Sequence, residues 1–199
     1  MEVVMVCSKF NCEKEMQEEA IDEILQYWFE DIDHSQWFVK DPDFDRELEQ
    51  RFGGLLTQAR NNQLDEWSNT PRGCLALIVL LDQFSRNVYR GTPLSFEADP
   101  KALQLTLRGI EEQFDEKLSL EQRSVFYLPL RHAENLEMQK LGLVKTREIN
   151  DEGYGTDKYA LNHLAIIERF GRFPHRIMIL GRHNTPDEEE YLKDNEAGF

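Results

Sequence analysis

The chain has 199 residues, of which 40% are hydrophobic and 31% are charged, and its formal net charge is −15 at pH 7. This length and composition are typical of a single folded domain with one core and exclude an intrinsically disordered chain. The acidic balance argues against nucleic acid as a partner, and the longest apolar run, Leu75 to Leu81, is too short to cross a bilayer, so we also expect no membrane partner.

The N-terminal region contains the first helix signal. Residues 17–30 place their apolar side chains on one stripe at helical spacing. We therefore divide the chain into an N-terminal extension over residues 1–15 and a single helical domain over residues 16–199. The extension has a short apolar patch but no basic lead-in, so it does not match a signal peptide.

Further helices are predicted in the first half of the chain. Pro42 stands at a first helical position with acidic residues behind it, and Gly53–Gly54 ends the pattern, so a separate short helix is expected over residues 55–65. Thr70 before Pro71 is the next start signal. The stretch that follows is apolar on all sides at its front and polar at its end, which predicts a buried central helix.

The second half of the chain also reads as a series of helices. Helices are predicted from Asp99 to about residue 113, over residues 120–126 behind a Ser119–Gln122 capping box, from Pro129 onward, over residues 157–170, and after Thr185. The most loop-like stretch is 149–156. About eight helices with short links predict an all-α fold of antiparallel neighbours.

Three long segments of the chain have an unusual composition. They are LALIVLLDQFSRNVYRGTPLSFEADPKAL, FYLPLRHAENLEMQ and IIERFGRFPHRIMILGRHNTPDEEEYL. Together with ILQYWFE and WFVKDPDFD, they resemble an uncharacterised family, the domain of unknown function numbered nine-two-four, over roughly residues 20–199. The resemblance implies an all-α helical array similar to tetratricopeptide-type hairpins. It implies no established activity, and the cofactor is unknown.

The chain departs from the usual wording of this family in three places. Ser85 stands where proline is typical, Ala133 and Asn135 stand where serine and aspartate are, and Ile177–Met178 replaces an Asn-Ala pair. If an acid at position 135 were an essential general base, this chain would lack it. Glu134 is then the carboxylate that could act instead.

Polar residues at the end of the central helix are the first candidates for ligand binding. Asp82, Arg86 and Arg90 follow at four-residue intervals and share one face of a helix, with Gln83 and Asn87 beside them. Because the preceding turns are apolar on all sides, we expect these side chains to face other protein or a cleft. The alternative is an Asp82–Arg86 pair that only solubilises the end of a helix.

The stretch IERFGRFPHRIMILGR supplies a second group of candidates. Arg169 and Arg172 lie at the end of a helix, where cations complement the helix dipole, and this accounts for one or two of the arginines. His175 and Arg176 follow Pro174, outside that helix. Because guanidinium groups bind carboxylate and phosphate through paired hydrogen bonds, we count Arg172, His175 and Arg176 as candidate ligand-binding residues.

Acid–base chemistry, if present, is expected from histidine, whose pKa lies near neutral. The candidate catalytic residues are His132, Glu134 and His175, although no nucleophile motif such as GxSxG occurs. His132 and Glu134 are two positions apart and cannot form a two-histidine zinc helix, so no metal site is predicted.

The cysteines indicate the compartment. Cys7, Cys12 and Cys74 form an odd set without CxxC spacing. Such unpaired thiols are typical of a reducing cytoplasm, where we place the protein. We expect Cys74 to be buried.

Three interpretations remain open. In the first, the candidate residues line a pocket for a small anionic molecule, used for binding or for a hydrolase-like reaction. In the second, the helical array is a scaffold that holds a peptide or protein partner in an extended groove. In the third, buried ion pairs only lock the fold. The pocket would be ruled out if each of these side chains were satisfied by its own buried acid.

Overall fold

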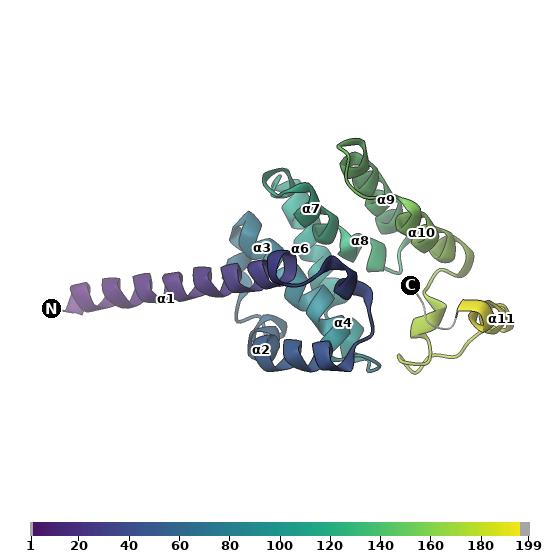
Figure 1. The fold of residues 1–199 in the computed structure, drawn as a ribbon, viewed down its shortest axis with the longest axis horizontal. Coiled ribbons are helices and arrows are strands. Elements are labelled where there is room, and N and C mark those ends of the chain that lie inside the picture. The colour runs from purple at the N-terminus through teal and green to yellow at the C-terminus, as the bar shows by residue number, and fades with distance from the viewer. Residues whose placement is uncertain (1, 196–199) are drawn as a thin grey trace.

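The computed structural model describes residues 2–195 of the chain, and it describes the side chains of residues 14–37 and 39–195. Within that part the chain is mainly helical and contains no β-strand, which confirms the predicted all-α fold. None of the described helices is long and apolar enough to span a membrane. Figure 1 shows a compact group of helices from which α1 (Glu2–Gln26) extends to one side.

The helix predicted over residues 17–30 is present. It consists of the C-terminal part of α1 and a π-helical turn over Tyr27–Asp31. Ile24 and Trp28 are completely buried, as the apolar stripe predicts. Since α1 begins at Glu2, the helix also runs through the predicted extension, and the division of the chain at residue 15 stays a prediction.

The next helix, α2 (Pro42–Arg60), corrects one prediction. It runs without interruption, so the break at Gly53–Gly54 and the separate helix over residues 55–65 are wrong. Phe52 and Leu56 lie on either side of the glycines and are both buried on the same face. Each glycine costs about 0.5–1 kcal/mol in a helix, whereas burying each of these side chains stabilises it by about 1.5–3 kcal/mol.

The centre of the molecule is a buried helical rod. It comprises α3 (Pro71–Ile78), a π-helical segment over Val79–Phe84 and α4 (Ser85–Val88). Every residue from Gly73 to Ser85 is buried, which confirms the predicted central helix. Burial also raises the pKa of the Cys74 thiol to about 12. The side chains of Cys7 and Cys12 lie outside the described residues.

Seven further helices follow this rod in the described part of the chain. They are α5 (Leu94–Glu97), α6 (Asp99–Glu111), α7 (Leu120–Phe126), α8 (Leu128–His132), α9 (Leu136–Asp151), α10 (Lys158–Phe170) and α11 (Pro186–Asn195). Short 3₁₀ turns connect helices of the chain, among them His34–Phe38 before α2 and Pro174–Arg176 after α10. Figure 1 shows α9 and α10 side by side as an antiparallel pair. The capping box at Ser119 is confirmed, and Thr185 and Glu188 form a second one. The stretch predicted as a loop over 149–156 begins inside α9.

The single helix predicted from Pro129 onward is in fact two helices. α8 ends at His132, and α9 begins directly after Asn135. The side-chain oxygen of Asn135 accepts hydrogen bonds from the backbone N–H groups of Glu137 and Met138 at 3.0 and 3.1 Å. Asparagine and aspartate cap helices about equally well. Residue 135 is therefore a helix cap, and no acid is required there to explain it.

Gly109→Ala tests the packing of α6 against α7. A Cβ at position 109 would lie 2.4 Å from Cζ of the completely buried Phe126. Overpacking of this kind costs about 1–3 kcal/mol, and we expect that loss in the free energy of unfolding.

The matched control is Gly54→Ala, because an exposed Cβ there meets nothing within 4 Å. The control should gain about 0.5–1 kcal/mol in urea unfolding. Equal effects at the two positions would contradict this packing.

Candidate functional site

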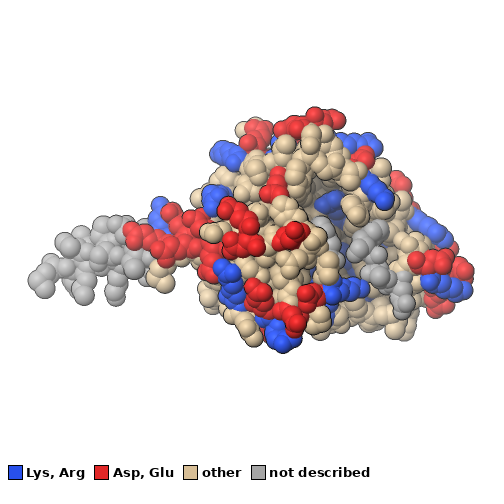
Figure 2. Space-filling view, in the orientation of Figure 1, with Lys and Arg blue, Asp and Glu red and all other residues tan. Residues whose placement is uncertain are grey.

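A cleft lies where the polar end of the central rod meets α8, α10 and the turns His34–Phe38 and Pro174–Arg176. Its volume is about 370 Å³. We call it the basic cleft, because its ionisable lining residues are Lys40, Arg86, Arg90, His132, His163, His175 and Arg176, and no aspartate or glutamate of the described chain lines it. In Figure 2, blue side chains lie inside a hollow of the molecule while red ones spread over the surrounding surface.

Asp82 lies completely buried behind this cleft and holds His132 in place. Its Oδ1 is 2.7 Å from Nδ1 of His132 and 3.5 Å from Arg86, and its Oδ2 accepts a hydrogen bond from Gln83 at 2.5 Å. Burial alone raises the pKa of the Asp82 carboxyl, but His132 and Arg86 outweigh it and hold that pKa well below its usual range.

The pKa of the His132 imidazole is lower than that of a free histidine. Burial lowers its pKa more than Asp82 raises it, and the nearby Arg86 and Arg176 lower it further. A neutral imidazole beside an ionised carboxylate donates its Nδ1–H to Asp82. Nε2 is then the nitrogen that is able to accept a proton.

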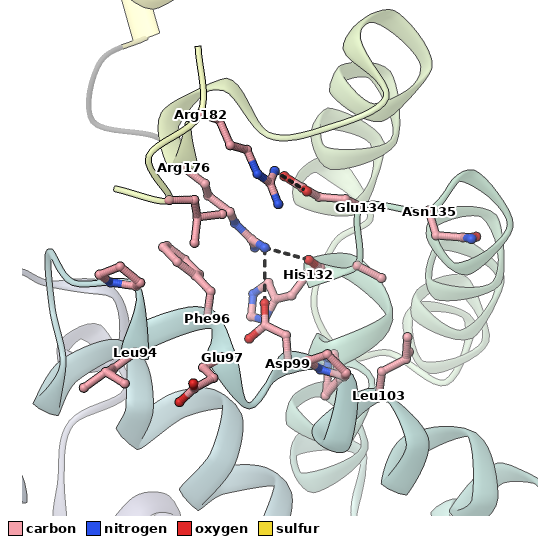
Figure 3. A pocket seen from close by; sticks show the side chains of 15 residues that line it. Leu94, Phe96, Glu97, Asp99, Leu103, His132, Glu134, Asn135, Arg176 and Arg182 are labelled. Atoms are coloured by element: carbon pink, nitrogen blue, oxygen red, sulfur yellow. Dashed lines mark hydrogen bonds and ion pairs between the residues drawn. The ribbon is translucent and has the colours of Figure 1, made fainter. Parts of the chain in front are cut away.

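Two arginines share one carboxylate beside this pair. Arg86 donates to Oδ2 of Asp99 at 2.9 Å, and Arg176 donates to the same oxygen at 3.2 Å. Arg176 also donates to the backbone carbonyl of His132 at 3.0 Å (Figure 3), and Arg86 donates to that of Ser95. The Nε of Arg176 is buried and has no hydrogen-bond partner within the described part of the chain.

Aromatic rings hold Arg176 rigidly. Its guanidinium carbon lies 4.7 Å from the ring centre of Phe96 and 4.5 Å from that of Phe173, and the residue is only 6% exposed. Burial and the charge of Arg86 lower the pKa of Arg176 to about 10. The carboxylates of Asp99, Glu134 and Asp82 raise this pKa, but burial and Arg86 outweigh them.

Two more histidines complete the lining. Burial lowers the pKa of both His163 and His175 to about 3, and Arg176 adds to the effect at each. Nδ1 of His163 donates to the backbone carbonyl of Tyr159 at 2.7 Å, and its ring centre lies 6.3 Å from that of His132. The described residues contain no group of three histidine, cysteine, aspartate or glutamate side chains arranged to hold a metal ion.

Arg90 and Asn87 lie at the edge of the cleft and are held by α2. Asp45 accepts two hydrogen bonds from Arg90, at 2.6 and 2.8 Å, and one from Asn87 at 2.9 Å. Unlike Arg176, Arg90 therefore has a carboxylate of its own. The structure thus brings most of the predicted ligand-binding residues together around the basic cleft.

Arg172 and Glu134 do not line this cleft. Arg172 donates two hydrogen bonds to Glu188, at 2.7 and 2.8 Å, and so joins the end of α10 to α11. Glu134 accepts from the backbone N–H of Phe173 at 2.9 Å and from Arg182 at 2.7 Å. These contacts account for both residues as supports of the segment that carries Arg176.

Sequence reasoning missed several residues of the cleft. Lys40, Phe96 and His163 line it but were not among the candidates. Lys40 lies in WFVKDPDFD, and Phe96 lies in LSFEADPKAL at the end of a longer segment. Both segments carry the family resemblance, and that resemblance was the signal that could have identified these two residues. Nothing in the local pattern around His163 distinguishes it from an ordinary helix residue.

Two half-buried histidines with lowered pKa values predict that the protein loses stability in acid. The pKa of His163 and of His175 is about 3 in the folded state and 6.5 without burial, so the unfolded state binds protons first as pH falls. The stabilisation is present above pH 6.5 and is lost as pH falls towards about 3. From about pH 7.5 to about pH 5.5, each histidine should cost about 1.4 kcal/mol of unfolding free energy.

Chemical denaturation at the two pH values measures this effect. His175→Asn should remove its share of the pH dependence, whereas the same replacement of the exposed His183 should not. An identical pH dependence in wild type and His175→Asn would show that His175 is not buried in its neutral form.

Comparison with known proteins agrees with this fold. The chain matches the family model "Bacterial protein of unknown function (DUF924)" over residues 24–196. It is similar to the solved structure of ATU0120, a protein of unknown function from Agrobacterium tumefaciens, with a TM-score of 0.81 and 36% sequence identity over 89% of this chain and 98% of that chain. No curated protein matches the chain. The chain therefore belongs to the DUF924 family, which its sequence segments resemble.

Proposed function

We propose that the basic cleft binds a small anionic molecule. One observation carries the proposal: the lining holds four lysine or arginine residues and three histidines, and no acid among the residues described, although the chain has a net charge of −15. A concave surface that carries one sign of charge focuses the field and attracts ligands of the opposite sign.

The arrangement of the arginines supports the same ligand. Arg86 and Arg176 donate to the same oxygen of Asp99, so Arg176 has no carboxylate of its own. Arg176 is also fixed between Phe96 and Phe173 before any ligand arrives. Fixing a binding group in advance lowers the entropy cost of binding.

The other two interpretations explain less. A network that only locks the fold accounts for Arg90 and Arg172, each of which has its own carboxylate, but not for the unpaired Nε of Arg176. A peptide-binding scaffold calls for an extended groove, whereas the basic cleft is a compact hollow between the ends of several helices. A hollow of about 370 Å³ suits a small molecule.

His132 gives this cleft the means for acid–base chemistry, which supports a hydrolase-like reaction. Asp82 fixes the orientation of the His132 ring and leaves Nε2 as the base. A bound anion would raise the pKa of His132 towards neutral. The hydroxyls of the nearby Ser85 and Ser95 donate to the backbone carbonyls of Leu80 and Thr92, so neither is placed as a nucleophile. Water activated by His132 is then the attacking group.

Titration calorimetry and thermal denaturation with inorganic phosphate, pyrophosphate and succinate test the proposed anion binding. Wild type should bind at least one of them and gain about 2.7 kcal/mol of stability at a ligand concentration of about 100 times Kd. Arg176→Met keeps the apolar contacts of the side chain but removes its charge, and Lys40→Ala removes a charge at the exposed mouth. Each should weaken binding about tenfold or more.

The control is Arg147→Ala. It removes the same charge from an exposed pair with Asp157 that does not line the cleft, so it should leave the affinity unchanged. Arg86 is unsuitable as a test, because it also holds the Ser95 carbonyl and two carboxylates, and its loss would destabilise the fold. If none of the three anions binds, or if Arg176→Met binds as tightly as Arg147→Ala, the proposal is wrong.

A further inference from the structure

A second hollow adjoins the basic cleft. Its volume is about 490 Å³, and Phe96, His132 and Arg176 line both hollows. Figure 3 shows the second hollow, with Phe96 next to Arg176 on one side and Leu94 and Leu103 below. The two hollows are therefore separated by no more than one layer of side chains. We call the second one the apolar pocket.

The apolar pocket differs from the basic cleft in its chemistry. Its apolar lining includes Leu94, Leu103, Leu180 and the prolines 93, 100 and 129. Leu94 is 42% exposed, so apolar surface lies open to solvent there. Covering such surface is favourable for any apolar group that fits.

Each of the three acids that line the apolar pocket is paired with an arginine. Glu134 binds Arg182 at 2.7 Å, Asp99 binds Arg86 and Arg176, and Glu97 binds Arg60. The pocket has no cation in excess, so it is not a second anion site. It suits an uncharged apolar group.

We infer that the ligand of the basic cleft is an amphipathic anion whose apolar part, a chain or ring of several carbon atoms, occupies the apolar pocket. This inference rests on the proposed function and narrows the class of ligand. The anionic group lies against Arg176 and Lys40, and the apolar part passes over the half-buried Phe96. His132 lines both hollows, so it lies beside the atoms that join the two parts of the ligand.

A series of alkyl phosphates tests this inference by calorimetry on the full chain. The probes are inorganic phosphate and methyl, butyl and hexyl phosphate, which keep the anionic group and lengthen only the apolar part. Burying one methylene group is worth a factor of about three to four in Kd. Wild type should therefore bind hexyl phosphate at least about tenfold more tightly than methyl phosphate.

Two leucine variants locate the alkyl chain. Leu94→Asn and Leu180→Asn place an amide in the apolar pocket at positions that are not fully buried, so the fold should tolerate them. Each should lower the gain from methyl to hexyl phosphate about threefold or more and leave the affinity for inorganic phosphate unchanged. Leu161→Asn is the matched control, because Leu161 is 39% exposed and lines neither hollow.

The outcomes separate this inference from the proposed function. If inorganic phosphate binds but hexyl phosphate binds no more tightly than methyl phosphate, the inference is wrong and the proposed function stands. If hexyl phosphate binds equally well to wild type and Arg176→Met, the alkyl chain binds without the anion and the inference is also wrong. If wild type dimerises and Leu94→Asn does not, a second copy of the chain covers the apolar pocket, which again overturns the inference.

Discussion

The buried carboxylate of Asp82 and its contact with His132 hold together the elements that form both hollows. Asp82 belongs to the central rod, and its 2.7 Å contact with His132 fixes the end of α8. Arg86 extends the same network to Asp99 at the start of α6, and Asp99 in turn binds Arg176. Removing one partner of a buried ion pair costs about 3–5 kcal/mol, so the relative position of these elements depends on this network.

The network also explains how an acidic protein forms a positive cleft. Asp82 is completely buried and Asp99 lines the apolar pocket, whereas the arginines and histidines line the basic cleft. Buried ion pairs add little net stability compared with apolar packing. The positive side chains that this network positions at the cleft therefore explain it better than its contribution to the stability of the fold does.

Much of the fold could be predicted from the sequence, because its signals are local. The caps at Thr70, Ser119 and Thr185 and the apolar central helix depend on residues a few positions apart. Two boundaries were predicted wrongly for physical reasons. At Gly53–Gly54 the burial of one helix face outweighs the cost of two glycines, and at Asn135 a capping side chain ends one helix pattern and starts another.

The site could be predicted only in part. The polar end of the central helix and the segment around Arg176 were recognised because charged residues there follow apolar or helix-ending ones. Their partners were not, because Arg176 and Asp99 are 77 positions apart, and Arg90 and Asp45 are 45 apart. These distant contacts decide whether an arginine has its own carboxylate or shares one. They therefore also decide whether the arginine is available to a ligand.

The most direct test of the account is a nitrogen NMR measurement of the histidine side chains during a titration with inorganic phosphate. Burial and Arg176 hold the pKa of His175 at about 3 in the free protein, so a phosphate bound in the basic cleft should raise it. The account predicts saturable shifts of the His132 and His175 ring nitrogens with one common Kd, and none for His183. Unchanged His132 and His175 resonances at saturating phosphate would contradict it.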